Sequence, residues 1–190
     1  QRHLGIVATG SERPVHWSGS PRKIDFFALK GMLESLFARL KLPGPVLKPD
    51  SEPGLHPGEA AALFHRDEKL GFLGRLDPSL AREYDVPGDI FFLELELEPV
   101  LSSITAQRYR KSSPFPGVRR DLSILVDQTT TCAELMEEIR KSSAIVANVT
   151  VFDLYQGEHV PEGKRSLAMS VLFRSRERTL RDEEVDRVFN

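Results

Sequence analysis

The sequence predicts an α+β fold divided into two domains, and three observations carry that prediction. Short runs of alternating apolar and polar residues predict strands, whereas apolar residues that recur every three or four positions predict amphipathic helices. A weakly patterned stretch around residues 99–107 separates the two halves. The composition is that of a globular chain, with 40% hydrophobic and 28% charged residues among 190. We therefore expect one domain over residues 1–104 and a second over residues 105–190.

The first domain is predicted to contain three strands, one long helix and a turn or short helix that Asp77-Pro78 opens. Residues 25–41 place apolar side chains on one helical face, and the Pro-Gly-Pro sequence at 43–45 ends that helix. Residues 49–58 are rich in proline and glycine, which predicts a loop. The Gly-Phe-Leu-Gly sequence at 71–74 is expected to bring neighbouring backbones close together. Strands are predicted at residues 60–64, 70–76 and 89–97.

The second domain is predicted to follow the order β-α-β-β-α. Its first strand alternates Leu122, Ile124 and Val126, and residues 131–134 form a capping-box signature that opens an amphipathic helix. One more strand would complete a ferredoxin-like split βαβ sheet, with both helices on one face and the other face open. The remaining two strands and the last helix are expected at residues 149–155, at 166–174 and around Val185.

Positive charge is clustered although the formal net charge of the chain is −2. Residues 108–120 contain five cations and no acid, and residues 164–181 contain six cations and one acid. Pro114 and Pro116 exclude a helix from residues 108–117, so this segment is predicted to be an extended basic arm. Because local clusters set the potential that a phosphate backbone meets, the arm indicates RNA binding. A solvated basic rim is the alternative.

Patterns that would support catalysis or metal binding are weak. None of the five histidines lies at metal-ligand spacing with another histidine, cysteine or acid, so no metal site is predicted. Cys132 could be a nucleophile activated by a helix N-terminus, but it also fits the apolar stripe of that helix, which favours core packing. Glu94, Glu96 and Glu98 could serve as acid and base, although a solvated or interface edge is commoner. No catalytic residue is assigned.

Three features of the whole chain bear on its origin and location. The single cysteine fits a reducing compartment, and no apolar run approaches the ~20 residues of a membrane-spanning helix. The sequence begins without methionine and ends inside a helical pattern. We therefore expect a cytoplasmic fragment of a longer protein, with no membrane contact.

Several ordered sequence blocks are distinctive. In the second half they lie at 109–122, 151–157, 161–168 and 178–180, and read YRKSSPFPGVRRDL, VFDLYQG, PEGKRSLA and RTL. In the first half they lie at 16–17, 25–31, 55–58 and 71–74, and read HW, DFFALKG, LHPG and GFLG. Their order and spacing resemble the C-terminal part of the bacterial phenylalanyl-tRNA synthetase beta chain. Three positions depart from the residues usual in that family: Ala28 replaces an Asp, Glu59 an Arg and Asp77 a His.

The resemblance implies a fold for each half. Residues 1–104 are expected to be part of a module shaped like a class II synthetase catalytic domain, with an antiparallel sheet but without the chemistry. Residues 105–190 are expected to be a ferredoxin-fold anticodon-binding domain whose last strand is missing. The family is similar to an (αβ)2 heterotetramer that charges tRNA-Phe, using ATP and magnesium in its alpha chain. The resemblance therefore implies a non-catalytic fragment without a cofactor site, which binds the anticodon region of tRNA-Phe and docks on the catalytic alpha chain.

The candidate RNA contacts combine positive charge and aromatic rings. Cations neutralise phosphates, and aromatic rings stack on unpaired bases. Phe115 and Tyr155 could stack in this way or could belong to the core. The candidates are Arg110, Lys111, Phe115, Arg119, Arg120, Tyr155, Lys164 and Arg174.

Two other function classes remain as alternatives. The second domain could be a structural module that braces an oligomer, while RNA is held elsewhere. It could also be a small-molecule-binding regulatory domain, which is disfavoured because no glycine-rich ligand loop lies between its first strand and helix. The fold alone does not separate these classes.

Overall fold

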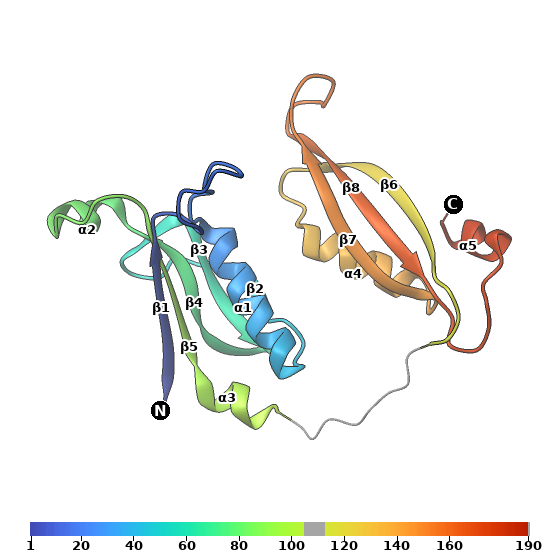
Figure 1. Cartoon of the computed structure of the whole chain (residues 1–190), viewed down its shortest axis with the longest axis horizontal. Helices are drawn as coiled ribbons and strands as arrows, with labels where there is room; N and C mark the ends of the chain where they lie inside the picture. Colours follow the sequence, from blue (N-terminus) through green and yellow to red (C-terminus); the bar gives the residue numbers. More distant parts are fainter. Residues whose placement is uncertain (105–112, 190) are drawn as a thin grey trace. The chain divides into compact units, whose positions relative to one another are not determined.

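The computed structural model describes residues 1–104 and 113–189, and the chain forms two compact units that divide between residues 108 and 109 (Figure 1). The elements of the first unit are β1 (His3–Thr9), α1 (Phe26–Leu40), β2 (Val46–Pro49), β3 (Leu55–His65), β4 (Glu68–Leu76), α2 (Pro78–Glu83), β5 (Ile90–Glu96) and α3 (Leu97–Ser102). Those of the second unit are β6 (Val118–Asp127), α4 (Cys132–Ser142), β7 (Val146–Tyr155), β8 (Lys164–Phe173) and α5 (Asp182–Phe189).

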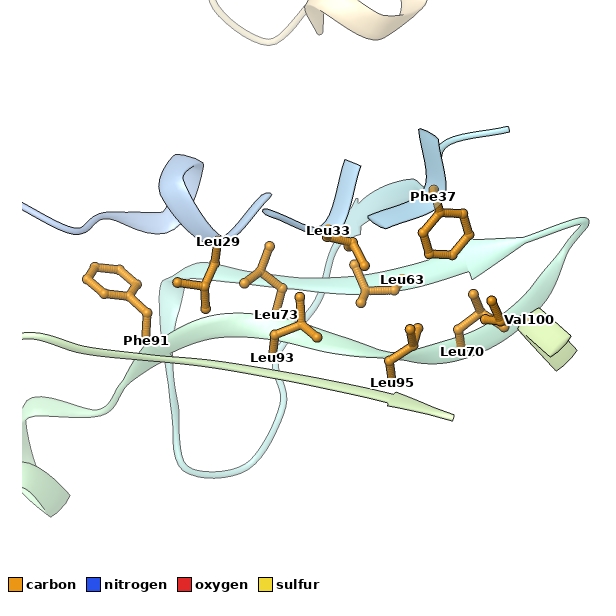
Figure 2. Packing of buried hydrophobic residues seen from close by; sticks show 10 residues of the cluster. All are labelled: Leu29, Leu33, Phe37, Leu63, Leu70, Leu73, Phe91, Leu93, Leu95 and Val100. Carbon is orange, nitrogen blue, oxygen red and sulfur yellow. The ribbon is translucent and has the colours of Figure 1, made fainter. Parts of the chain in front are cut away.

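The first unit is a five-stranded antiparallel sheet with α1 packed on one face. The strand order is β1-β5-β4-β3-β2. Figure 2 shows the apolar side chains of α1 lying against those of β3, β4 and β5. Burying each such side chain contributes roughly 1.5–3 kcal/mol, so this layer dominates the stability of the unit. The buried cluster consists of Leu29, Leu33, Phe37, Leu63, Leu70, Leu73, Phe91, Leu93, Leu95 and Val100.

Helix α1 begins and ends as its sequence predicts. The Asp25 carboxylate accepts a hydrogen bond from the Ala28 N–H at 2.7 Å, which caps the N-terminus. Lys41 adopts a left-handed conformation with φ of 59° and terminates the helix before the Pro-Gly-Pro sequence. The expected close approach at residues 71–74 is also confirmed, because a Cβ on Gly71 would lie 1.9 Å from the Glu94 carbonyl oxygen.

Some expectations for the first unit were wrong. The predicted loop at 49–58 overlaps β3, which begins at Leu55, and the pairing of β3 with β4 is irregular between Leu55 and Ala60. This irregularity accommodates Pro57, which has no backbone N–H to donate. The predicted strand at 89–97 is confirmed as β5, but α3, which follows it directly, was not predicted. Pro99 lies in the first turn of α3, where a missing N–H costs nothing. Strands β1 and β2 were not predicted.

The second unit confirms the expected β-α-β-β-α order and the α+β fold class. Its antiparallel sheet has the order β6-β8-β7, and α4 and α5 pack on the same face over one core. The capping box of α4 is present: Thr131 Oγ1 accepts from the Glu134 N–H, and the Glu134 carboxylate accepts from the Thr131 N–H at 2.8 Å. Cys132 packs against this core, as its place in the apolar stripe predicted.

Candidate nucleic-acid interface

The sheet face of the second unit that α4 and α5 leave uncovered is called the open face here. Side chains alternate between the faces of a strand, and the fully buried residues of β8, such as Leu167 and Met169, point toward the helices. The open face therefore carries the other set. Its residues are Arg119, Asp121, Ser123 and Leu125 on β6, Ser166, Ala168, Ser170 and Leu172 on β8, and Asn148, Thr150, Phe152, Asp153 and Tyr155 on β7.

Two of the predicted RNA-binding arginines lie at one end of the open face. Arg119 is exposed and pairs across the sheet with Leu172, and Arg174 follows the last residue of β8. A Cβ on Gly117 would lie 2.8 Å from the Leu172 side chain and 3.3 Å from Arg174 Nε. The Arg174 side chain is thus on the same side as Leu172. Neither arginine forms an ion pair with any residue that the structure describes.

Arg120 has a different environment although it neighbours Arg119 in the sequence. Its guanidinium points to the helix-covered side, where Nη2 lies 3.0 Å from Asp182 and 3.1 Å from Asp186 of α5. The hydrogen bond to Asp182, which has the largest effect, and the one to Asp186 raise the pKa of Arg120 above its usual value. The structure therefore gives Arg120 the role of tying α5 to β6 and separates it from the open-face arginines.

The remaining predicted cations differ in how far the structure describes them. Lys164 Nζ lies 3.3 Å from Asp127 in an exposed ion pair, which is weak enough to exchange for a phosphate. Arg110 and Lys111 lie outside the described residues. In the described part of the basic arm, Ser113 Oγ donates a hydrogen bond to the Ser175 carbonyl oxygen at 2.8 Å. This bond ties the arm to the segment that follows β8.

The two predicted stacking residues are both accessible in part. Phe115 is half-buried, and its N–H donates to Ser113 Oγ at 3.2 Å. Tyr155 lies on the open face opposite Ser166 with 48% of its surface exposed. Its hydroxyl donates to the Glu158 carbonyl at 3.1 Å, which holds the ring at the start of the β7–β8 turn. The geometry of Tyr155 permits stacking on its free face.

A hollow of about 290 Å³ on the open face includes a residue that the sequence analysis had not assigned. Phe152 is 59% exposed and lines this hollow together with Arg119. A pairing irregularity between Val151 and Asp153 lies at this position, and such bulges redirect side chains. The alternation of β7 in the sequence could have identified this residue. Val149 and Val151 face the core, so Phe152 is expected to point to the other face. The other lining residues are Asp121, Asn148, Thr150, Ser170 and Leu172.

The first unit presents a second candidate surface, along the outer side of α1. Phe27 and Met32 are 67% and 46% exposed, and the small residues Ala28, Gly31 and Ser35 line a shallow hollow beside Met32. The loop before α1 carries Trp17, which is 91% exposed. Exposed aromatic and large apolar side chains on an ordered helix are typical of protein interfaces. We use the name α1 surface for Trp17, Phe27, Ala28, Gly31, Met32 and Ser35.

The three positions that depart from the family's usual residues have identifiable contacts. The Glu59 carboxylate lies 2.6 Å from Arg75 Nε, and Asp77 caps α2 by accepting from the Ser79 N–H at 2.7 Å. Ala28 lines the hollow of the α1 surface. Glu59 and Asp77 thus contact other residues of the first unit, whereas the small side chain of Ala28 forms part of a surface hollow.

The described part of the chain contains neither a candidate metal-ligand cluster nor a helix that could span a membrane. Within residues 1–104 and 113–189, no group of three or more His, Cys, Asp or Glu side chains is placed to hold a metal ion. In the same part of the chain, no helix has both the length and the apolar composition needed to cross a bilayer.

Two family models match the chain, and their limits follow its two units. Residues 1–97 match the phenylalanyl tRNA synthetase beta chain CLM domain, and residues 113–190 match the ferredoxin-fold anticodon binding domain. The first match alone covers half of the chain.

Individual proteins of the same family are similar to this chain over nearly its whole length. The phenylalanine–tRNA ligase beta subunit of Symbiobacterium thermophilum is 39% identical over 98% of the chain, which corresponds to 21% of that protein. Those of Thermotoga maritima and Bacillus cereus are 37% and 36% identical over 98% and 100% of the chain, or 24% of each protein. The chain thus spans less than a quarter of these relatives' length, and it belongs to the phenylalanyl-tRNA synthetase beta chain family.

Proposed function

We propose that the chain is the C-terminal part of a beta subunit of phenylalanine–tRNA ligase. In this proposal its second domain, from residue 105 onward, binds the anticodon region of tRNA-Phe through the open face. The first domain, residues 1–104, docks on the catalytic alpha chain of an (αβ)2 heterotetramer. The assembly is cytoplasmic, and ATP and magnesium act in its alpha chain. This fragment contributes recognition and docking but no catalytic group.

The observation that carries RNA binding is the composition of the open face. Arg119 and Arg174 have no ion-pair partner among the described residues and can neutralise phosphates, and they lie at the end of the sheet where the basic arm enters β6. Tyr155 and Phe152 offer exposed aromatic rings on β7. An uncovered sheet that combines cations with exposed aromatic rings is the arrangement by which many modules bind unpaired RNA bases. Each stacked base contributes about 1–3 kcal/mol.

The α1 surface supports docking on a protein partner. Trp17 and Phe27 are large aromatic residues that remain exposed, so a partner that covers them removes a large apolar area from water. The name of the related proteins, beta subunit, is that of one component of an assembly. A partner helix laid along α1 would cover Phe27 and Met32 and fill the hollow beside Met32.

The proposal is tested by titrating the 190-residue chain with a tRNA-Phe anticodon stem-loop at several salt concentrations. We expect binding whose affinity falls steeply with salt, because each neutralised phosphate releases counterions. Reversal of charge in the pair Arg119→Glu and Arg174→Glu should weaken binding and flatten the salt dependence. The matched control also reverses two charges, Arg140→Glu with Lys141→Glu, at exposed cations in the last turn of α4 on the other side of the sheet.

The same titration discriminates the structural alternative. If the second domain only braces the oligomer, the chain will bind the alpha chain tightly but show no salt-sensitive binding to the stem-loop. Equal loss of binding in the control with Arg140→Glu and Lys141→Glu and in the open-face double variant would assign the interaction to overall charge instead of the open face.

A further inference from the structure

Residues 10–24, which connect β1 to α1, form a hairpin (Figure 1). An isolated β-bridge joins Ser11 to Lys23, and the Glu12 N–H donates to the Arg22 carbonyl oxygen at 2.9 Å. The two arms of the segment therefore run side by side. The residues at its tip are left in solvent, because no other part of the first unit covers them.

The tip of this hairpin carries two exposed apolar side chains. Trp17 is 91% exposed and Val15 is 88% exposed. The His16 ring lies beside Trp17 with the ring centroids 5.3 Å apart, and His16 Nδ1 lies 3.0 Å from Ser18 Oγ. Loop tips usually consist of small and polar residues, so a tryptophan in this place is unusual. Tryptophan is also among the residues most enriched in the binding hot spots of protein interfaces.

Arg22 ties the base of the hairpin to the start of α1. Its Nη2 lies 2.8 Å from the Asp25 carboxylate, and its Nε lies 3.8 Å from the Glu12 carboxylate. Asp25 is also the N-cap of α1, since it accepts a hydrogen bond from the Ala28 N–H. The position of the hairpin is thus coupled to that of the helix by a side-chain contact as well as by the chain itself.

The charges of the hairpin indicate what surrounds the binding site of its partner. Residues 13–24 contain three cations, Arg13, Arg22 and Lys23, and no acid. Arg22 is engaged by Asp25, whereas Arg13 and Lys23 form no ion pair within the part of the chain that the structure describes. A complementary surface carries negative charge where these two cations meet it. A pocket that receives Trp17 should therefore have acidic groups at its rim.

A protein pocket accounts for the tip better than a nucleic acid does. Bases bind aromatic faces by stacking, but Val15 offers no such face, and His16 approaches one side of Trp17. An apolar pocket accommodates both Val15 and Trp17. The hairpin also leads directly into α1, where Phe27 and Met32 are exposed apolar side chains of the kind that protein interfaces bury.

We propose that Trp17 is an anchor that inserts into an apolar pocket with an acidic rim on the catalytic alpha chain, and that Arg22 positions this anchor. The inference rests on the proposed docking of the first domain. It adds to the helix contact of α1 a second contact that is made by the hairpin. Arg22 is a positioning residue, because it holds the base of the hairpin through Asp25 while Trp17 enters the pocket.

The environment of Trp17 can be followed directly, because it is the only tryptophan of the chain. The 190-residue chain is labelled with fluorotryptophan and titrated with unlabelled alpha chain. We expect the ¹⁹F signal to shift and to lose its solvent isotope effect, since the ring leaves water. Trp17→Ala should weaken binding about 30-fold or more, as expected for a hot spot. Tyr84→Ala truncates another exposed aromatic side chain of the first unit and should leave the affinity unchanged.

The positioning role of Arg22 is tested by a double-mutant cycle. Arg22→Ala should weaken binding about 2- to 10-fold, because the hairpin is then ordered only when it binds. Arg22→Lys keeps a cation that can pair with Asp25 and should restore most of the affinity. In a chain that already carries Trp17→Ala, Arg22→Ala should have little further effect. Arg82→Ala, at an exposed arginine of α2, is the control.

The acidic rim is tested by reversing one charge beside the tip. Arg13→Glu should weaken binding to the alpha chain about tenfold or more, because like charges then meet at the rim. The matched control is Arg82→Glu, which reverses an exposed charge on α2. An affinity that is unchanged in Arg13→Glu would exclude the acidic rim.

The outcomes separate this inference from the proposed function. Binding to the alpha chain with an unchanged ¹⁹F signal and no loss in Trp17→Ala would overturn the anchor and leave docking intact. Absence of binding by the unmodified chain would overturn both. A ¹⁹F signal that responds to tRNA-Phe but not to the alpha chain would assign Trp17 to RNA and overturn the inference. Equal effects of Arg22→Ala with and without Trp17 would exclude Arg22 as the positioning residue.

Discussion

Arg119 and Arg120 are adjacent in β6 but belong to opposite faces of the same sheet. Arg119 lies on the open face without an ion-pair partner among the described residues, whereas Arg120 binds two aspartates of α5. The helix-covered face holds the apolar core, and the open face holds polar and aromatic side chains around a hollow. The difference shows that positive charge in a sequence cluster does not by itself mark a phosphate contact. The face on which each cation lies decides whether it is free to bind.

The largest effect that distinguishes the two faces should come from truncating one leucine on each. Leu167 is fully buried beneath the helices, so Leu167→Ala should destabilise the second unit by about 2–5 kcal/mol. Leu125 is 55% exposed on the open face, so Leu125→Ala should change stability by no more than about 0.5 kcal/mol. Amide hydrogen exchange in β8 measures both values. Equal protection in the two variants would contradict the assignment of the faces.

The next largest effect concerns the two arginines. Arg119→Ala should weaken stem-loop binding and reduce the slope of log affinity against log salt by about 1, with little change in thermal stability. Arg120→Ala should do the reverse, because it releases Asp182 and Asp186 without touching the open face. Melting curves and salt titrations of both variants provide the comparison. Loss of RNA binding in Arg120→Ala at unchanged stability would place Arg120 in the interface.

A pH dependence is expected on the helix-covered side. The hydrogen bond from Arg178, followed by the bond from the Arg181 N–H, lowers the pKa of Glu184 to about 2. A carboxyl whose pKa is depressed in the folded state stabilises the fold above its unfolded pKa of about 4.3. That contribution should be lost as the pH falls from about 5 toward 2. Urea unfolding of the chain and of Glu184→Gln should therefore differ at pH 6 and converge near pH 2.

The smallest effect is expected at the exposed pair of Lys164 and Asp127. Both side chains are solvated, and such pairs contribute about 0–1 kcal/mol. Lys164→Gln should leave the melting temperature nearly unchanged at physiological salt. A drop in stem-loop affinity in this variant would show that Lys164 leaves Asp127 to bind phosphate.

Local patterns in the sequence predicted much of this fold. The helical stripe and termini of α1, the capping box of α4 and the order of elements in the second unit depend on neighbouring residues, and all are present. Strands β1 and β2 depend on distant partners, since His3 pairs with Glu96 and Val46 with Phe64. A short strand of this kind acquires its conformation from the sheet that it joins, so its own sequence carries little signal.

The candidate site was predicted less completely than the fold. Alternation along β6 implies that Arg119 and Arg120 face opposite ways, but it does not show which face the helices cover. The ion pairs of Arg120 depend on α5, which follows more than sixty residues later in the chain. Phe152 could have been assigned to the outward set from Val149 and Val151, whereas the hollow beside it requires three strands in register.

The most direct test of the open face is NMR chemical-shift mapping of the labelled chain during titration with the anticodon stem-loop. The account predicts that the Arg119 side-chain Nε–Hε signal and the backbone amides of Phe152 and Tyr155 shift strongly. The Nε–Hε signal of Arg120 and the amides of α4 and α5 should stay in place. Shifts concentrated on α4 and α5, with the open face unaffected, would contradict the account.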